Sequence, residues 1–264
     1  MIRTLKAQLG DRLTIWVFEP KKSFRRFLYP DFKILTFQDM RDDLINPPTK
    51  KVELYNWRRI VAELLGREQQ FKIASKNHLI ETLVQLEKER KRPTNAQLLE
   101  KLKADFKDAG LFRESDPIQS LINRFSALAE YDDHSRKVII QIQDLKRMDM
   151  VIELGDSNTE NERFRIGILL SRLYHYKKHH RQDRHYNVIV IDEGRELFGD
   201  TSSGFGESVL EGMFALSREM DIGFIVATQE PKKDIERCRV RTAEEQKRYG
   251  DALEFRPISD FYIE

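Results

Sequence analysis

One segment, residues 187–200 with the sequence "NVIVIDEGRELFGD", constrains the fold more than any other part of the chain. Its aliphatic run, residues 188–191, has no alternating polar residues, which is typical of a strand covered on both faces in a parallel sheet. Two adjacent carboxylates, Asp192 and Glu193, follow directly. The carboxyl end of such a strand lines the ligand crevice, where a carboxylate stays hydrated or meets a cation. The pair therefore indicates either Mg²⁺ coordination with water activation or a solvated acidic turn.

Length and composition allow one large α/β core with a helical insertion, since the chain has 264 residues. Charged residues make up 34% of the sequence but nearly cancel, so the net charge of +2 does not decide whether nucleic acid is a partner. The single cysteine, Cys238, excludes an intramolecular disulfide and a multi-cysteine zinc site and favours a reducing compartment. No apolar run approaches the ~20 residues that span a bilayer, so we expect a cytoplasmic protein without a membrane segment.

Strand and helix patterns alternate along the chain. Besides the segment above, strand character is found in residues 13–20, 32–37, 137–145 and 222–231. Helical spacing is found in residues 2–9, closed by Gly10, in residues 161–178, and from Gly204 to about Glu219. This alternation predicts a parallel sheet covered by helices.

A long helical stretch interrupts that alternation from about Tyr55 to Glu130. Within it, Thr94 and Gln97 have the spacing of a capping box at a helix start. The chain therefore divides into residues 1–54, an insertion of residues 55–130, and residues 131–264. We expect the insertion to be an appendage outside the sheet that contacts a neighbouring subunit or partner, because it exceeds an ordinary crossover connection.

Two strands that we expect to be neighbours end in polar residues: one in Asp192 and Glu193, the other in Thr228 and Gln229. In a nucleotide hydrolase the acidic strand holds the metal and orients water, while a polar residue on the adjacent strand senses the γ-phosphate. Arg218 precedes the second strand. It is either a solvated surface residue or, in a ring assembly, an arginine that reaches a neighbour's phosphate.

Four segments together resemble the HerA/FtsK-like DNA-translocating P-loop ATPases, especially the HerA and type IV secretion ATPase branch. They are "VIVIDEGRELF", "LSREMDIGFIVATQEP", "WVFEPKKSF" and "INPP", and the resemblance covers most of residues 1–231. It implies a RecA-like parallel sheet of P-loop NTPase type. It also implies ATP hydrolysis with Mg²⁺ by a hexameric ring that moves DNA through its pore.

The resemblance implies a role for each matching residue. Asp192 would bind Mg²⁺ on a Walker B strand, Glu193 would be the catalytic base, Gln229 the sensor and Arg218 a finger acting on the neighbouring subunit. Three further residues are candidates for nucleotide contact. These are Thr228, at the end of the sensor strand, and Lys21 and Lys22, which follow a strand's carboxyl end but would otherwise be ordinary surface residues.

The sequence also departs from the family pattern. Asp192 and Glu193 are followed by Gly194 and Arg195, where the family usually has a small residue and then His or an aromatic residue, and position 19 is Glu where Asp is common. The largest departure concerns the phosphate-binding loop, which needs Gly-Lys followed by Ser or Thr. None of the twelve glycines precedes a lysine, so no Walker A motif is present.

The register of the resemblance places Met1 just after the point where Gly-Lys-Thr is expected. The first strand and the P-loop are then absent, through truncation or a split gene or in a naturally loop-less subunit. In the usual strand order the absent strand would lie beside residues 223–229 and leave that edge bare. We expect negligible ATP hydrolysis by this chain alone, and either a homo-hexamer or a partner chain that completes the sheet.

Two functions follow, and an unrelated α/β nucleotide-binding module is a third possibility. The chain is a fragment or subunit of an ATPase that couples hydrolysis to DNA translocation, or it is a non-catalytic structural or binding subunit with the same fold. The most basic stretch, residues 172–186, leaves its own alternatives open: a solvated surface, a contact with DNA phosphates, or a metal site at His175 and His179.

Overall fold

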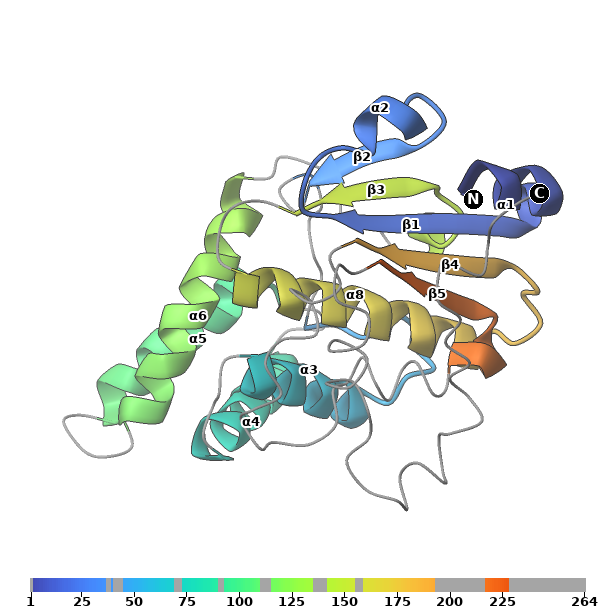
Figure 1. The fold of residues 1–264 in the computed structure, drawn as a ribbon. Coiled ribbons are helices and arrows are strands. Elements are labelled where there is room, and N and C mark those ends of the chain that lie inside the picture. Colours follow the sequence, from blue (N-terminus) through green and yellow to red (C-terminus); the bar gives the residue numbers. More distant parts are fainter. Residues whose placement is uncertain are drawn as a thin grey trace, which may run out of the picture.

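The structure is a computed structural model, and it describes residues 2–36, 39, 45–68, 73–89, 93–109, 115–134, 142–154, 159–192 and 217–227. These residues contain a five-stranded sheet in the order β2-β3-β1-β4-β5 (Figure 1). The strands are β1 (Leu13–Glu19), β2 (Lys33–Thr36), β3 (Met150–Glu153), β4 (Tyr186–Ile191) and β5 (Ile222–Val226). All four strand pairings are parallel, which confirms the predicted parallel α/β sheet.

The helices lie on both faces of the sheet and beyond it. They are α1 (Ile2–Leu9), η1 (Gly10–Arg12), α2 (Arg25–Leu28), α3 (Leu54–Glu68), α4 (Ile73–Glu89), α5 (Asn95–Ala109), α6 (Ser115–His134), α7 (Ile142–Leu145), α8 (Thr159–His179) and η3 (Arg218–Met220). None of the helices in these ranges is long and apolar enough to cross a membrane.

The central strand β1 explains why the sheet strands lack polar alternation. All seven of its residues are buried, and successive side chains point to opposite faces. Trp16 and Phe18 pack with α8, and the Trp16 indole donates a hydrogen bond to the Leu145 carbonyl at 3.1 Å. Ile15 and Val17 pack on the other face, with residues of α1 and α2. A strand covered on both faces therefore has apolar residues at most of its positions.

The helical insertion has a core of its own. Helices α3 to α6 follow β2 and precede β3, and they lie outside the sheet, with α3 and α4 on the far side of α8 (Figure 1). Trp57, Leu98 and Phe125 are fully buried among them, and Phe164 and Ile168 of α8 join the same cluster. Helix α8 therefore packs on the sheet with one side and on the insertion with another. The predicted helical segment is confirmed, whereas its exact boundaries stay a prediction.

Two local predictions about helix ends are also confirmed. At the start of α5, the Thr94 N–H donates to Gln97 Oε1 at 3.0 Å and the Gln97 N–H donates to Thr94 Oγ1 at 3.2 Å, which is the reciprocal bonding of a capping box. At the end of α1, Gly10 has a φ of 54°, the left-handed conformation in which glycine ends a helix without strain.

The strand predicted at residues 137–145 is wrong in its last part. Residues Ile142–Leu145 form helix α7, and the strand of this region is instead β3, four buried residues between β1 and β2. Ile142 and Leu145, three positions apart, both pack into the core beside α8, so a helical turn buries them as effectively as a strand. Residues 137–141 lie outside the described part, and so does the predicted helix from Gly204 up to residue 216.

Strand β5 is the last strand at one side of the described sheet. It pairs with β4 and is less buried than its neighbour: Ile225 and Val226 are half-buried, whereas Ile189 and Ile191 of β4 are fully buried. Within the described residues, β5 is therefore at the edge where we expected it.

Candidate functional site

Asp192 lies at the middle of the sheet's carboxyl edge. Strand β4 ends at Ile191, and the hydrogen bonds to the adjacent strands continue one step further: the Asp192 N–H donates to the Phe18 carbonyl at 3.0 Å, and the Ala227 N–H donates to the Ile191 carbonyl at 2.8 Å. Asp192 is half-exposed, with β1 on one side and β5 on the other. A carboxylate that emerges here from a parallel sheet is well placed to meet a cation. Its role as a metal ligand stays a prediction.

Three predicted site residues lie outside the described part of the chain. Glu193 follows Asp192 directly, and Thr228 and Gln229 follow Ala227, the last described residue of this region. The backbone up to Asp192 and Ala227 therefore leads towards all three from neighbouring strands. Their roles as base, nucleotide contact and sensor stay predictions.

Arg218 lies near the amino ends of the strands, opposite the carboxyl edge that carries Asp192. It is the first residue of η3, which precedes the amino end of β5. Five residues of β5 separate this end from the carboxyl end, a distance of about 15 Å at ~3.3 Å per residue. The structure therefore does not bring the Arg218 backbone close to Asp192 of the same chain. An action on the nucleotide of a neighbouring subunit stays a prediction.

The turn that carries Lys21 and Lys22 follows β1 at the same edge as Asp192. Both lysines are exposed, and Lys22 has a φ of 55°, the left-handed region that non-glycine residues rarely adopt. The structure thus places the predicted lysines at the end of the sheet where a nucleotide is expected, in a turn of unusual conformation.

The sequence analysis did not predict that two carboxylates next to this turn are buried. Glu19 and Glu153 are the last residues of β1 and β3, are aligned as partners in the sheet, and are 0% and 1% exposed. Glu19 accepts hydrogen bonds from the Ser23 N–H and hydroxyl and from the Phe24 N–H. A signal was present, because each strand is an apolar run that ends in glutamate, "WVFE" and "MVIE".

Arg25, at the start of α2, pairs with Glu153. Its guanidinium makes two hydrogen bonds to the carboxylate, one of them from Nη2 at 2.6 Å. The hydrogen bond and the negative charge of Glu153 raise the pKa of Arg25 above its ordinary value. Both buried carboxylates therefore bind the segment that runs from the end of β1 into α2.

The basic stretch of residues 172–186 is partly buried. Lys177 is 2% exposed and its ammonium group donates to the His185 carbonyl, while His185 Nε2 lies 2.7 Å from Thr14 Oγ1. Burial lowers the pKa of the Lys177 ammonium, with smaller effects from neighbouring charges. Lys177 thus serves the packing of α8 against the amino end of the sheet, whereas Lys178, Arg181 and Arg184 are exposed.

One residue of the proposed metal pair in that stretch, His175, packs against the insertion. Burial, and then the charges of Lys178 and His179, lower the pKa of His175 to about 4. The ring makes an edge contact with Trp57 of α3, with 6.0 Å between the ring centroids. Among the described residues there is no group of three or more His, Cys, Asp or Glu side chains that could hold a metal ion.

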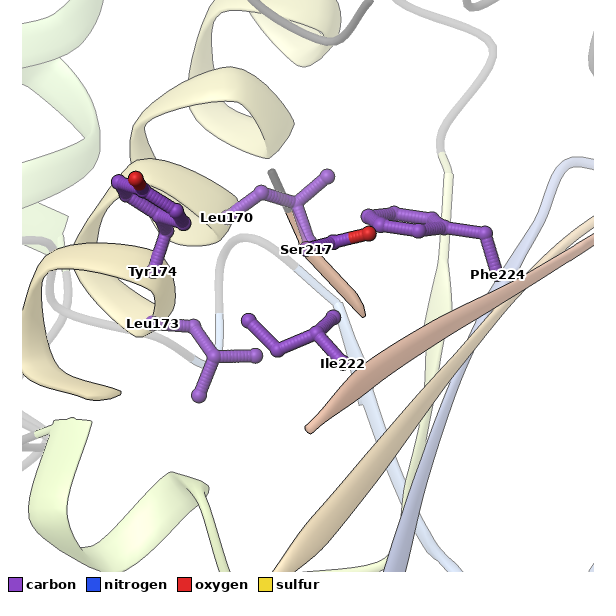
Figure 2. A pocket seen from close by; sticks show the side chains of 6 residues that line it. All are labelled: Leu170, Leu173, Tyr174, Ser217, Ile222 and Phe224. Carbon is purple, nitrogen blue, oxygen red and sulfur yellow. The ribbon is translucent and has the colours of Figure 1, made fainter. Parts of the chain in front are cut away.

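A small apolar pocket lies at the amino end of β5, away from Asp192. Figure 2 shows the side chains that line it: Leu170, Leu173 and Tyr174 of α8, Ser217, and Ile222 and Phe224 of β5. No charged side chain lines the pocket, so it is unsuited to phosphate.

The fold is similar to that of one solved structure. The chain matches the structure of VirB4 of Thermoanaerobacter pseudethanolicus with a TM-score of 0.58 and 12% sequence identity, over 92% of this chain and 95% of that chain. No protein-family model matches the sequence, and a search of curated proteins finds no match. At this identity the likeness shows the fold alone, an all-parallel sheet covered by helices, and it does not show to which family the chain belongs.

Proposed function

We propose that the chain is a subunit or fragment of a VirB4-like ATPase that binds ATP with Mg²⁺ at the carboxyl edge of the sheet and couples ATP hydrolysis to DNA translocation. The observation that carries this proposal is the position of Asp192, half-exposed between β1 and β5 at that edge, in a fold similar to VirB4. Bound Mg²⁺ would neutralise the charge that develops on the phosphates during hydrolysis.

Each candidate residue has a distinct task in this proposal. Asp192 holds the metal ion, and Glu193 accepts a proton from the attacking water. Thr228 and Gln229 contact the γ-phosphate from the neighbouring strand, while Lys21 and Lys22 neutralise phosphate charge from the turn after β1.

Arg218 has a task of its own, because it belongs to the opposite edge of the sheet. In a hexameric ring it stabilises the transition state at the nucleotide of the adjacent subunit. The complete set of charges at one nucleotide then comes from two chains.

A second function is favoured by one feature of the sequence. The 264 residues contain no Gly-Lys-Ser/Thr, the motif whose backbone and lysine hold the β- and γ-phosphates. Phosphoryl transfer depends on positioning and charge stabilisation, to which that loop is central. The alternative is therefore a non-catalytic binding or structural subunit, and in both cases the chain alone should turn over ATP negligibly.

Equilibrium binding of MgATP to the purified chain tests the proposal, with Asp192→Asn as the site variant. We expect Mg²⁺-dependent binding that is lost in Asp192→Asn, with no turnover. Absence of nucleotide binding in the wild type would contradict the nucleotide site and leave the structural subunit. Robust ATP hydrolysis that Glu193→Gln abolishes would contradict the expected inactivity. Light scattering with and without DNA measures the oligomeric state and so tests the proposed hexameric ring.

A further inference from the structure

Three carboxylates stand in a row at the carboxyl edge of the sheet, on β3, β1 and β4. Glu153 is the aligned partner of Glu19, and Phe18 is the partner of Ile191, so Glu19 stands between Glu153 and the position of Asp192. Only Asp192 is half-exposed, whereas the other two are fully buried. The row thus has one member that solvent reaches and two that are fully buried.

Both buried carboxylates bind one short segment. Glu19 and Glu153 each lie two residues after a valine, Val17 and Val151, and so point to the same face of the sheet as these valines. That is the face that α2 covers. On that face Glu19 holds the backbone of Ser23 and Phe24, and Glu153 holds Arg25. The Glu19 carbonyl is also fixed, since it accepts a hydrogen bond from the Leu154 N–H at 2.9 Å.

Two buried carboxylates cost more free energy than an ordinary surface turn requires. A buried carboxylate is strongly destabilising unless hydrogen bonds and opposite charge compensate it, and replacement by an apolar residue of similar volume is often neutral or stabilising. The turn also keeps Lys22 in the left-handed region at a φ of 55°. Local strain of this kind persists only where the surroundings enforce it, and it clusters at functional sites.

We propose that Glu19 is a positioning residue that, with the Arg25–Glu153 pair, holds the Lys21–Lys22 turn against the phosphates of a nucleotide bound beside Asp192. The inference rests on the proposed function. The Ser23 and Phe24 N–H groups already donate to Glu19, so the exposed lysine side chains, rather than these two backbone groups, would face the phosphate. Ammonium groups next to a metal-binding carboxylate match the charge of a nucleoside triphosphate with its cation.

The test is a double-mutant cycle read out as the Kd for MgATP. We expect Lys21→Ala/Lys22→Ala to weaken binding about tenfold, the size of one or two charge-assisted contacts, and Glu19→Gln to weaken it by a similar factor. In the background without the lysines, Glu19→Gln should have less than about a twofold effect, because it acts through them. A purely structural Glu19 would weaken binding equally in both backgrounds, which would overturn the proposal.

Controls separate this inference from the proposed function. Lys103→Ala removes an exposed lysine from α5 and should leave the Kd unchanged. Adenosine, as a probe without phosphate, should bind wild type and the lysine variant alike. If wild type does not bind MgATP, the proposed function fails and this inference with it. If wild type binds and the lysine variant binds equally well, only the inference fails.

A second pair of variants leaves the buried carboxylates untouched, in case Glu19→Gln does not fold. Lys22→Asn keeps a residue that tolerates the left-handed conformation but removes the charge, whereas Lys22→Arg keeps the charge. We expect weaker MgATP binding for the first and near wild-type binding for the second. Equal affinities for the two variants would overturn the role of Lys22.

Discussion

The neutral imidazole of His175 should make the free energy of unfolding depend on pH. In the folded chain burial and nearby cations lower its pKa to about 4, against an ordinary value of 6.5. As the pH falls, the imidazole is therefore protonated at a higher pH in the unfolded chain than in the folded chain. The contribution of His175 to stability is complete above about pH 6.5 and is lost progressively as the pH falls towards 4.

The size of the effect follows from the two pKa values. A difference of 2.5 units corresponds to at most about 3.4 kcal/mol, at ~1.36 kcal/mol per unit. Between pH 7 and pH 5 the same linkage gives about 1.8 kcal/mol. Because the ring is only partly buried, solvent screening reduces this, and we expect a loss of about 1 kcal/mol.

Urea denaturation at pH 7, 6 and 5 and constant ionic strength measures this loss. Because burial also lowers the pKa of His185, the comparison must be with a variant rather than with pH alone. His175→Phe keeps an aromatic ring against Trp57 and cannot be protonated. The variant should lose about 1 kcal/mol less than wild type between pH 7 and pH 5. Identical losses for the two proteins would refute the assignment to His175.

Three further changes test other parts of the structure. Phe125→Ala empties a fully buried position of the insertion core and should cost about 3–5 kcal/mol in urea denaturation; a cost below about 1 kcal/mol would contradict the packing. Thr94→Ala removes one half of the capping box with Gln97 and should cost about 1 kcal/mol, whereas Thr94→Ser should cost much less. Burial opposes ionisation of Asp183, but its hydrogen bond and ion pair with Lys146 lower its pKa overall. Asp183→Asn should therefore lower the free energy of unfolding at pH 7, and the difference from wild type should shrink below about pH 4. A difference that does not depend on pH would contradict this.

The sequence predicted those parts of the fold that have a continuous apolar run or a long helical spacing of apolar residues. Strands β1 and β4 are apolar at nearly every position, and the buried apolar residues of α8 recur from Phe164 to Tyr176. Strand β3 has only four residues, and its place in the sheet depends on two neighbours that are distant in sequence. The alternating pattern of residues 137–145 was the stronger local signal, although its last part is helical because tertiary packing buries Ile142 and Leu145 in a helix.

The sequence predicted the position of a site residue only where the direction of its strand determines that position. The position of Asp192 follows from a rule about parallel sheets, because the rule requires only the strand and its end. The pairing of Glu153 with Arg25 requires the strand order, which places β3 next to β1 and under α2. The burial of Lys177 was missed for a similar reason: its charge is plain in the sequence, but the contact that buries it comes from His185 across a turn.

The two edges of the sheet hold different parts of the proposed chemistry. The carboxyl edge has Asp192 and the lysine turn, whereas Arg218 belongs to the amino edge, a strand length away. A rigid parallel sheet cannot bring these edges together by a local rearrangement, since β4 and β5 are hydrogen-bonded along their whole length. If Arg218 acts on a nucleotide, that nucleotide must belong to another copy. In an assembly whose partner chain supplies the phosphate loop, loss of activity in Arg218→Ala should therefore be rescued by mixing with Asp192→Asn subunits, because each variant supplies the residue that the other lacks.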